Sequence, residues 1–159
     1  MKIENARIED AKELTDLTIR SKSYWNYSDQ QIEIWRNDLT VTADYILEKE
    51  VFKLVMENKI IGYYSYFKQQ GSDFKLENLF IEPTAMSKGF GKRLMVDFFK
   101  RILKNEFNKV VLDADPNAEK FYAKLGFNVV GKMETSIKNR YLPIMEMSRN
   151  SVKRYIEMS

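Results

Sequence analysis

An extended segment that leads through a glycine-containing loop into an amphipathic helix constrains this chain more than any other feature. Residues 76–83 read Leu-Glu-Asn-Leu-Phe-Ile-Glu-Pro, and residues 86–94 read Met-Ser-Lys-Gly-Phe-Gly-Lys-Arg-Leu. The glycines at 89 and 91 lack a Cβ, so backbone N–H groups can converge on an anion at the positive end of the helix dipole. The helix has a broad apolar face formed by Leu94, Met95, Phe98, Phe99, Ile102 and Leu103. This arrangement predicts a pyrophosphate site.

The residues around the two glycines exclude the common nucleotide-binding loops. A dinucleotide fingerprint needs a third glycine at position 94, where this chain has Leu94. A Walker loop needs Gly at position 86 and Ser or Thr at position 93, where the chain has Met86 and Arg93. Positive charge near the loop comes from Lys88, Lys92 and Arg93. The sequence therefore favours an anion site that differs from both of these nucleotide-binding loops and that holds its ligand mainly through backbone N–H groups.

A second segment helps to identify that site. Residues 112–127 read Leu-Asp-Ala-Asp-Pro-Asn-Ala-Glu-Lys-Phe-Tyr-Ala-Lys-Leu-Gly-Phe. Together the two segments resemble the GNAT superfamily of acyl-CoA-dependent N-acetyltransferases, whose loop has the form Arg/Gln-x-x-Gly-x-Gly/Ala and whose later segment contains a Phe-Tyr pair and Gly-Phe. The resemblance covers most of the chain, from Lys2 to about Arg149. It departs from the family at Met86, where Arg or Gln is usual, and at Ser87, where Gly is frequent.

The resemblance implies one α/β (α+β) domain with a mixed, mostly antiparallel sheet that is flanked by helices and splayed to admit acyl-CoA. We expect residues 1–149 to form this acetyltransferase domain and residues 150–159 to be a C-terminal extension of it that contains a short helix. Along the chain we expect a hairpin that turns near Asn58-Lys59 and a buried strand over residues 109–113. A helix should begin at Asp115-Pro116 and end at Gly126, before final strands over residues 127–134 and 144–149.

The resemblance also implies acetyl-CoA as the co-substrate, and we expect no metal. The backbone of Leu79, Phe80 and Ile81 would hold the pantetheine arm as if it were an added strand, and an N–H group there could stabilise the tetrahedral oxyanion. Asn117 would either bond to that arm or serve in a helix cap. The expected cofactor-binding residues are Leu79, Phe80, Ile81, Met86, Ser87, Lys88, Gly89, Phe90, Gly91, Lys92, Asn117, Phe121 and Tyr122.

The side chains that are available limit the chemistry. The chain has no His and no Cys, so cysteine nucleophiles, Ser–His triads, histidine bases and nearly all zinc sites are excluded. Direct acyl transfer without a covalent enzyme intermediate needs none of these. The resemblance implies that Tyr122 protonates the departing thiolate, although its spacing from Ala118 and Leu125 also fits a core position. Glu77 is the expected base for the amine, directly or through water, or else an exposed strand carboxylate.

A loop rich in aromatic residues is the candidate acceptor site. Tyr24, Trp25 and Tyr27 lie close together between two expected helices, among small polar residues. In the resembled fold this connection borders the acceptor, and aromatic faces there could hold an amine by cation–π contact. Arg140, in the loop between the last two strands, would face the same cleft. The alternative is that these residues only pack.

The predicted function is transfer of an acetyl group from acetyl-CoA to a primary amine in a ternary complex. The acceptor would be a small-molecule amine or a peptide, and acetylation of a protein N-terminus or lysine is an alternative. A non-catalytic acyl-CoA-binding or sensing module is an alternative of another class. The 26 basic and 23 acidic residues are scattered, and no apolar run approaches the roughly 20 residues of a membrane span. We therefore expect a cytoplasmic protein with no nucleic-acid or membrane partner, and the sequence leaves a homodimer open.

Overall fold

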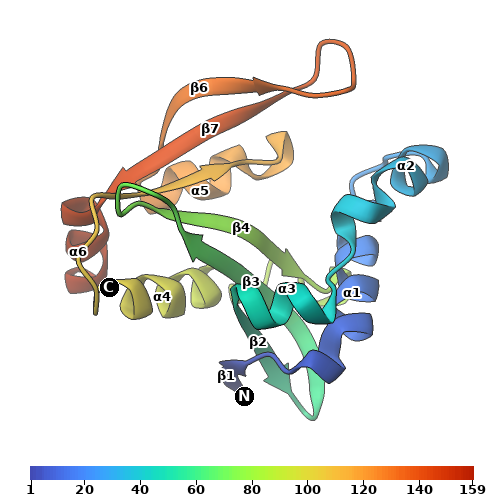
Figure 1. Ribbon diagram of the computed structural model, residues 1–159, viewed down its shortest axis with the longest axis horizontal. Helices are drawn as coiled ribbons and strands as arrows, with labels where there is room; N and C mark the ends of the chain where they lie inside the picture. The colour runs from blue at the N-terminus through green and yellow to red at the C-terminus, as the bar shows by residue number, and fades with distance from the viewer. The chain divides into compact units, whose positions relative to one another are not determined.

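Seven strands form a mixed sheet in the order β1-β2-β3-β4-β5-β7-β6 (Figure 1). Their bounds are β1 (Lys2–Asn5), β2 (Glu50–Met56), β3 (Lys59–Lys68), β4 (Phe74–Ile81), β5 (Lys109–Asp113), β6 (Asn128–Glu134) and β7 (Tyr141–Ser148). The pairs β1–β2, β2–β3, β5–β7 and β6–β7 are antiparallel. Strand β4 pairs in parallel with β5, through Phe74–Val110 and Lys75–Val111. The predicted α/β fold with a mostly antiparallel sheet is confirmed.

Helices lie between β1 and β2, between β4 and β5, between β5 and β6, and after β7. They are α1 (Ala11–Ser23), α2 (Asp29–Leu39), α3 (Ala43–Glu48), α4 (Phe90–Ile102), α5 (Glu119–Leu125) and α6 (Arg149–Glu157), with 3-10 turns η1 (Ile8–Asp10), η2 (Pro83–Ala85) and η3 (Pro116–Ala118). Three of the helices have a hydroxyl side chain as their N-cap. Ser28, Thr42 and Ser148 each accept a hydrogen bond from a backbone N–H of the first turn.

The computed structural model describes residues 1–159, which form two units. The first unit contains Met1–Tyr66 and Asn78–Asp97, and the second contains Phe67–Glu77 and Phe98–Ser159. Strands β3 and β4 and helix α4 therefore contribute residues to both units. The splay of the sheet and the assignment of residues 1–149 to one domain stay predictions.

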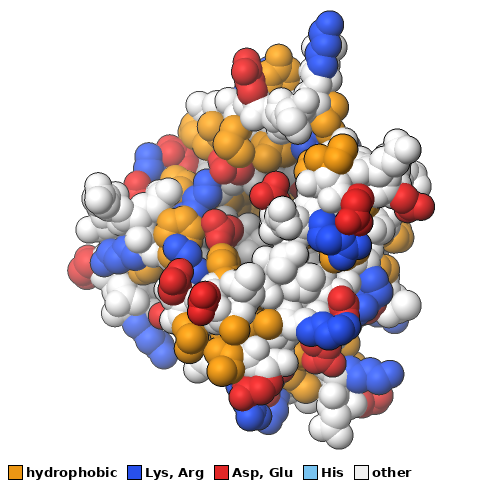
Figure 2. Space-filling view, turned by 45° about the vertical axis from the view of Figure 1, so that its right-hand side comes forward, with side chains coloured by type: hydrophobic (Ala, Val, Ile, Leu, Met, Phe, Trp, Pro, Cys, Tyr) orange, Lys and Arg blue, Asp and Glu red, His pale blue; other side chains and the backbone are white.

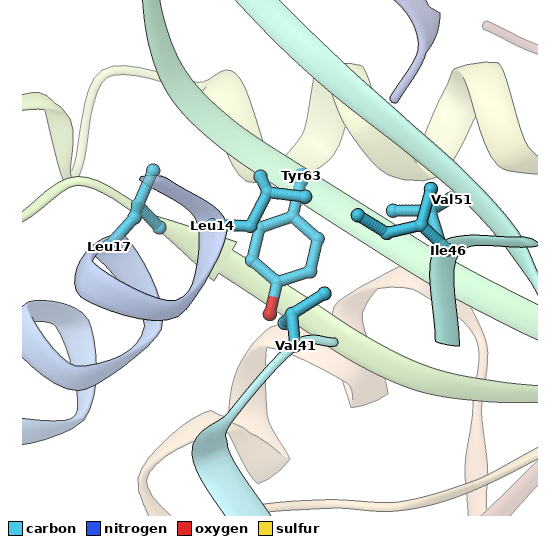
Figure 3. Packing of buried hydrophobic residues seen from close by; sticks show 6 residues of the cluster. All are labelled: Leu14, Leu17, Val41, Ile46, Val51 and Tyr63. Atoms are coloured by element: carbon cyan, nitrogen blue, oxygen red, sulfur yellow. The ribbon is translucent and has the colours of Figure 1, made fainter. Parts of the chain in front are cut away.

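The first unit has a core built around Tyr63. The ring of this residue lies among five aliphatic side chains (Figure 3), and the whole cluster is Leu14, Leu17, Val41, Ile46, Val51 and Tyr63. The Tyr63 hydroxyl is 2.5 Å from the Thr18 hydroxyl, and both residues are buried. Burial of these apolar side chains stabilises the packing of α1 and α3 on β2 and β3.

The two faces of β3 contact different helices because side chains alternate along a strand. Tyr63 and Ser65 face α1 and α3, where they contact Thr18 and Tyr45. Tyr64 lies on the opposite face and donates a hydrogen bond to Asp97 of α4, at 2.7 Å. Helices thus cover both faces of this part of the sheet.

Gly62 of β3 permits close approach of β4 and α4 within the first unit. A Cβ at this position would lie 2.8 Å from Ile81 Cδ1, 3.1 Å from the Phe80 carbonyl oxygen and 3.2 Å from Leu94 Cδ1. We expect Gly62→Ala to lower the free energy of unfolding by about 1–3 kcal/mol, because a methyl group overpacks this site. Urea denaturation measures the change. Gly131→Ala is the matched control, since its Cβ would meet Ile144 at an ordinary 3.5 Å, and equal stability of the two variants would contradict the prediction.

The second unit has its core where the end of α4 meets β5, β7 and the two C-terminal helices. Its largest fully buried side chains include Phe98, Phe99, Ile102, Leu112 and Met145. The Phe99 ring lies 6.2 Å from that of Phe127 and 5.8 Å from that of Tyr155 in α6. The expected short helix near the C-terminus is therefore present, and it packs on the core of this unit.

Several expected boundaries differ from the structure by one to three residues. The β2–β3 turn is at Glu57-Asn58, one residue earlier than expected, with φ of 51° and 64°. Positive φ at both positions is what a type I′ two-residue hairpin turn requires. The segment after Asp115 is the 3-10 turn η3 before α5 begins, and β7 begins at Tyr141 rather than at residue 144. Helix α5 does stop where expected, because its last residue is Leu125 and Gly126, with φ of 115°, caps it.

The surface carries both signs of charge. On the face drawn in Figure 2, Lys and Arg side chains are interspersed with Asp and Glu side chains. The formal net charge is +3, so neither sign dominates the chain as a whole. None of the helices has the length and apolar character needed to cross a bilayer.

Candidate functional site

The glycine-containing loop joins η2 to α4 in the first unit. Ser87, at the position where the resembled family often has Gly, has φ of 63°, and Gly89 has φ of 85°. A Cβ at Gly89 would meet no atom within 4 Å, so glycine serves the backbone conformation there rather than a close contact. Gly91 instead lies inside α4, as the second residue of this helix. Met86 is half-buried, whereas Ser87 and Lys88 are exposed.

The start of α4 has the geometry of an anion site. The Arg93 N–H donates to the Gly89 carbonyl at 3.1 Å, so the N–H groups of residues 89–92 have no acceptor within the helix. These donors and the helix dipole favour negative charge. A hollow of about 280 Å³ lies here, lined by Lys88, Gly89, Phe90, Lys92, Arg93 and Val96. Three cationic side chains and the helix N-terminus therefore surround one hollow.

A partly exposed ion pair connects α1 to the chain just before this loop. Arg20 of α1 donates from Nε and Nη2 to the two carboxylate oxygens of Glu82, each at 2.8 Å. These hydrogen bonds with Glu82 raise the pKa of Arg20 above its ordinary value. The Glu82 N–H also donates to the Ile61 carbonyl, at 2.9 Å. Because Pro83 then begins η2, the end of β4 and the entry to the loop are held in place.

The residues expected to bind the pantetheine arm form the end of β4. Leu79, Phe80 and Ile81 are half-buried. Phe80 packs against the core of the first unit, with its ring 6.0 Å from that of Tyr63. The side chain of Phe80 thus serves packing, and the binding role expected for the backbone of this segment stays a prediction.

A ring of three hydrogen-bonded side chains lies directly beside this segment, and the sequence reasoning missed it. The Tyr45 hydroxyl is 2.8 Å from the Ser65 hydroxyl. Asn78 Nδ2 donates to Ser65 Oγ at 2.9 Å and to the Tyr45 hydroxyl at 3.2 Å. Ser65 is fully buried, and Tyr45 and Asn78 are half-buried. The available signal was Asn78 itself, the one polar residue on the strand face that also carries Phe74, Leu76 and Phe80.

In the second unit, Tyr122 is held in α5 by aromatic packing. It is 8% exposed, and its ring makes edge contacts with Phe121 at 5.2 Å and Phe127 at 5.7 Å. Burial raises the pKa of the Tyr122 phenol above its ordinary value, and the negative charge of Asp115 adds to the effect. The phenol therefore stays protonated at neutral pH, as a proton donor must.

Asp115 connects two other expected site residues within the second unit. Its Oδ1 accepts from the Asn117 N–H at 2.9 Å, and its Oδ2 accepts from Arg140 Nη2 at 3.4 Å. The capping role expected for this segment is present at Asp115, while the side chain of Asn117 is exposed. Arg140 is thus an ion-pair partner that connects the β6–β7 loop to η3.

The predicted base lies in the part of β4 that belongs to the second unit. Glu77 is exposed, and alternation places it on the opposite strand face from Leu76 and Asn78. Its role as the base stays a prediction.

The aromatic loop in the first unit divides into a packed part and an exposed part. Tyr27 contacts Trp35 with ring centroids 4.8 Å apart, and the Lys22 ammonium lies 5.3 Å and 5.1 Å from these two rings. Tyr24 and Trp25 contact each other at 5.0 Å, yet they are 55% and 42% exposed. Neither belongs to the buried core, and the choice between acceptor binding and packing for this pair stays a prediction.

Comparisons with known proteins agree with this arrangement. Residues 25–150 match the family described as the acetyltransferase (GNAT) domain. A relative described as the uncharacterized N-acetyltransferase ycf52 of Gracilaria tenuistipitata var. liui is 26% identical over 98 residues, which are 62% of this chain and 51% of that protein. The matched region thus spans about half of that relative's length.

Two solved structures share the fold at low identity. The PaiA N-acetyltransferase of Thermoplasma acidophilum, in complex with coenzyme A, has a TM-score of 0.76 and 20% identity over 92% of this chain and 98% of its own. An aminoglycoside 6'-N-acetyltransferase complexed with coenzyme A has a TM-score of 0.72 and 16% identity over 94% of this chain and 97% of its own.

Proposed function

Since the chain belongs to the GNAT acetyltransferase family, we propose that it transfers an acetyl group from acetyl-CoA to a primary amine by direct attack in a ternary complex. The observation that carries this proposal is the start of α4, where unbonded N–H groups and three cationic side chains surround one hollow. Such a site fits the pyrophosphate of coenzyme A. Coenzyme A in the two structural relatives supports the same ligand.

In the proposed complex the cofactor contacts fall into three groups. The loop and helix start bind the pyrophosphate, and the backbone of Leu79–Ile81 binds the pantetheine arm and the developing oxyanion. Residues of η3 and α5 contact the acyl end. The proposed residues are Leu79, Phe80, Ile81, Met86, Ser87, Lys88, Gly89, Phe90, Gly91, Lys92, Asn117, Phe121 and Tyr122.

The chemistry needs one base and one acid. A substrate ammonium has a pKa of about 10, so the amine loses a proton before it attacks, and Glu77 takes this proton through a water molecule. The amine nitrogen then bonds to the acetyl carbon, the carbon–sulfur bond breaks, and the nitrogen gives its second proton to water, from which the Tyr122 phenolate is later reprotonated. Tyr122 protonates the departing thiolate. Because the phenol is buried and its pKa is raised, it holds the proton that this step requires.

The acceptor is proposed to be a small amine or a peptide, bound with help from Tyr24, Trp25, Tyr27 and Arg140. The exposure of Tyr24 and Trp25 supports a contact surface in that loop. A protein N-terminus or lysine is the alternative acceptor, and a non-catalytic acyl-CoA-binding module is the alternative function. Cytoplasmic location stays a prediction.

A panel of amines tests the function. We expect the protein with acetyl-CoA to release coenzyme A when one of three probes is present: putrescine, kanamycin A or a peptide with a free N-terminal alanine. A thiol reagent measures the release, and mass spectrometry identifies the acetylated amine. Acetyl-CoA binding in calorimetry without any turnover would favour the sensing module, and no binding at all would overturn both.

Removing the exposed indole tests the acceptor loop. We expect Trp25→Ala to raise KM for the acceptor about 2- to 30-fold, which corresponds to the roughly 0.5–2 kcal/mol of a cation–π contact. The free energy of unfolding should change by less than about 0.5 kcal/mol, because the side chain is 42% exposed. The matched control is Ile34→Ala on α2, which removes a side chain that is 70% exposed. An equal effect of both variants on KM would exclude a specific role for Trp25.

A further inference from the structure

The hydrogen-bonded ring of Tyr45, Ser65 and Asn78 contains three contacts. The number of hydrogen atoms available for these contacts determines which end of the Asn78 amide faces the ring. Each contact needs one hydrogen. With Nδ2 of Asn78 toward the ring, the amide supplies two hydrogens and one hydroxyl supplies the third, so the contacts at 2.8, 2.9 and 3.2 Å are all satisfied. With Oδ1 toward the ring, only two hydroxyl hydrogens would serve three contacts. The complete ring therefore requires Nδ2 inward.

This orientation turns the other end of the amide outward. Both Nδ2 hydrogens are used within the ring, so Oδ1 of Asn78 points away from Ser65 and Tyr45. Ser65 is fully buried and anchors the ring, while Asn78 is half-buried. An amide held by two hydrogen bonds cannot rotate without breaking both, so Oδ1 is an acceptor fixed in advance of any ligand.

The position of Asn78 in β4 places it next to the proposed cofactor site. It directly precedes the Leu79–Ile81 segment whose backbone is proposed to hold the acyl arm. It also shares a strand face with Phe80, which packs toward α1 and α3 rather than toward α4. A fixed hydrogen-bond acceptor thus lies in the first unit beside the proposed position of the acetyl group.

We propose that Oδ1 of Asn78 binds the acceptor amine by accepting a hydrogen bond from its nitrogen. The inference rests on the proposed function and deepens it. The amine uses one N–H for this contact and keeps its lone pair for the acetyl carbon. An amide oxygen is not a base at neutral pH, so it orients the nitrogen and leaves proton removal to another group. A neutral acceptor also serves the amine both before and after that proton leaves.

This assignment defines the class of substrate. The nitrogen must retain a hydrogen for this contact while its lone pair attacks, and the primary amine of the proposed function does so. The ring contributes no charged side chain, so it selects the N–H group rather than the positive charge. Recognition of charge is left to other residues such as the aromatic loop.

The test measures acceptor KM and acetyl-CoA affinity for matched variants, with putrescine, kanamycin A and the alanine peptide as probes. We expect Asn78→Ala to raise acceptor KM about tenfold with acetyl-CoA affinity unchanged. Tyr45→Phe should raise KM about threefold in the native background, because the amide loses one anchor. It should have no effect in the Asn78→Ala background, where there is no amide to orient. Tyr63→Phe removes a buried hydroxyl from the same layer and should leave KM unchanged.

The outcomes separate the inference from the function on which it rests. Acetylation with KM unchanged in both Asn78→Ala and Tyr45→Phe overturns the inference alone. Equal effects of Tyr45→Phe in the two backgrounds also overturn it, because the hydroxyl then acts without the amide. If Asn78→Ala does not fold, the Tyr45→Phe result on KM decides by itself. If the native protein acetylates none of the probes, both the proposed function and the inference are overturned.

Discussion

Replacing Tyr122 with Phe is expected to lower kcat by about 10²–10⁴-fold, the usual contribution of general acid catalysis, with acetyl-CoA affinity nearly unchanged. The substitution keeps the ring and its edge contacts with Phe121 and Phe127. It removes only the proton that the departing thiolate would take. Steady-state kinetics with a saturating amine measures kcat, and calorimetry measures the affinity.

The pH profile adds an independent check. Burial raises the pKa of Tyr122 above its ordinary value, so the acid form persists and this group should cause no loss of kcat between pH 7 and pH 9. Tyr155→Phe is the matched control, since it removes another phenol in the same unit that packs on Phe99. A near-native kcat for Tyr122→Phe would reduce Tyr122 to a packing role and make water the proton donor.

Local signals in the sequence were enough to predict several elements. The buried strand was expected over residues 109–113, and β5 is Lys109–Asp113. Ser28 caps α2 by accepting from the N–H of Gln31, and this contact joins residues only three apart. Gly126 ends α5 with φ of 115°, a conformation that an ordinary residue would resist. In each case the determining interaction is within a few residues of the chain.

Boundaries set by other strands were harder to predict. Strand β7 begins at Tyr141 because its first residues pair with β6, through Glu134–Tyr141 and Lys132–Pro143. Pro143 has no N–H to donate to the ladder, which disfavours proline within a strand. Its carbonyl nevertheless accepts from the Ala114 N–H at 2.9 Å. The partner strand, which the local sequence does not reveal, determines where β7 begins.

In the candidate site, too, some features follow from the local sequence and others depend on contacts between distant segments. The conformation of the loop at Gly89 follows from its own residues, and its φ of 85° needs glycine. The ring of Tyr45, Ser65 and Asn78 joins α3, β3 and β4, so it appears only once the register of these elements is known. The aromatic loop likewise gave no local sign that Tyr27 packs on Trp35 while Trp25 remains exposed.

A negative charge at the start of α4 is expected to lower acetyl-CoA affinity at least tenfold. Gly91 is the second residue of this helix, among the N–H groups that are proposed to bind the pyrophosphate. The carboxylate in Gly91→Asp would compete for those donors and repel the ligand, and each lost charge-assisted bond is worth roughly 1.5–3 kcal/mol. Calorimetry with acetyl-CoA measures the loss.

The stability of the same variant should move in the opposite direction. An acidic residue in the first turn interacts favourably with the helix dipole, by about 0.3–1 kcal/mol, and replacing Gly inside a helix also favours the fold. We therefore expect an unchanged or higher Tm together with the weaker binding. Lost affinity in an unstable protein would instead indicate damage to the fold.

Gly91→Asn separates charge from size, because the two side chains have nearly the same shape. We expect Asn to weaken binding less than Asp, and added salt to narrow the difference, since ions screen an exposed charge. Met86→Ala should have little effect, because the proposed site uses backbone N–H groups and Met86 stands where the family usually has Arg or Gln. If both Gly91 variants bind acetyl-CoA with the affinity of the native protein, the pyrophosphate does not bind at the start of α4. The three cationic side chains around the hollow would then need another ligand.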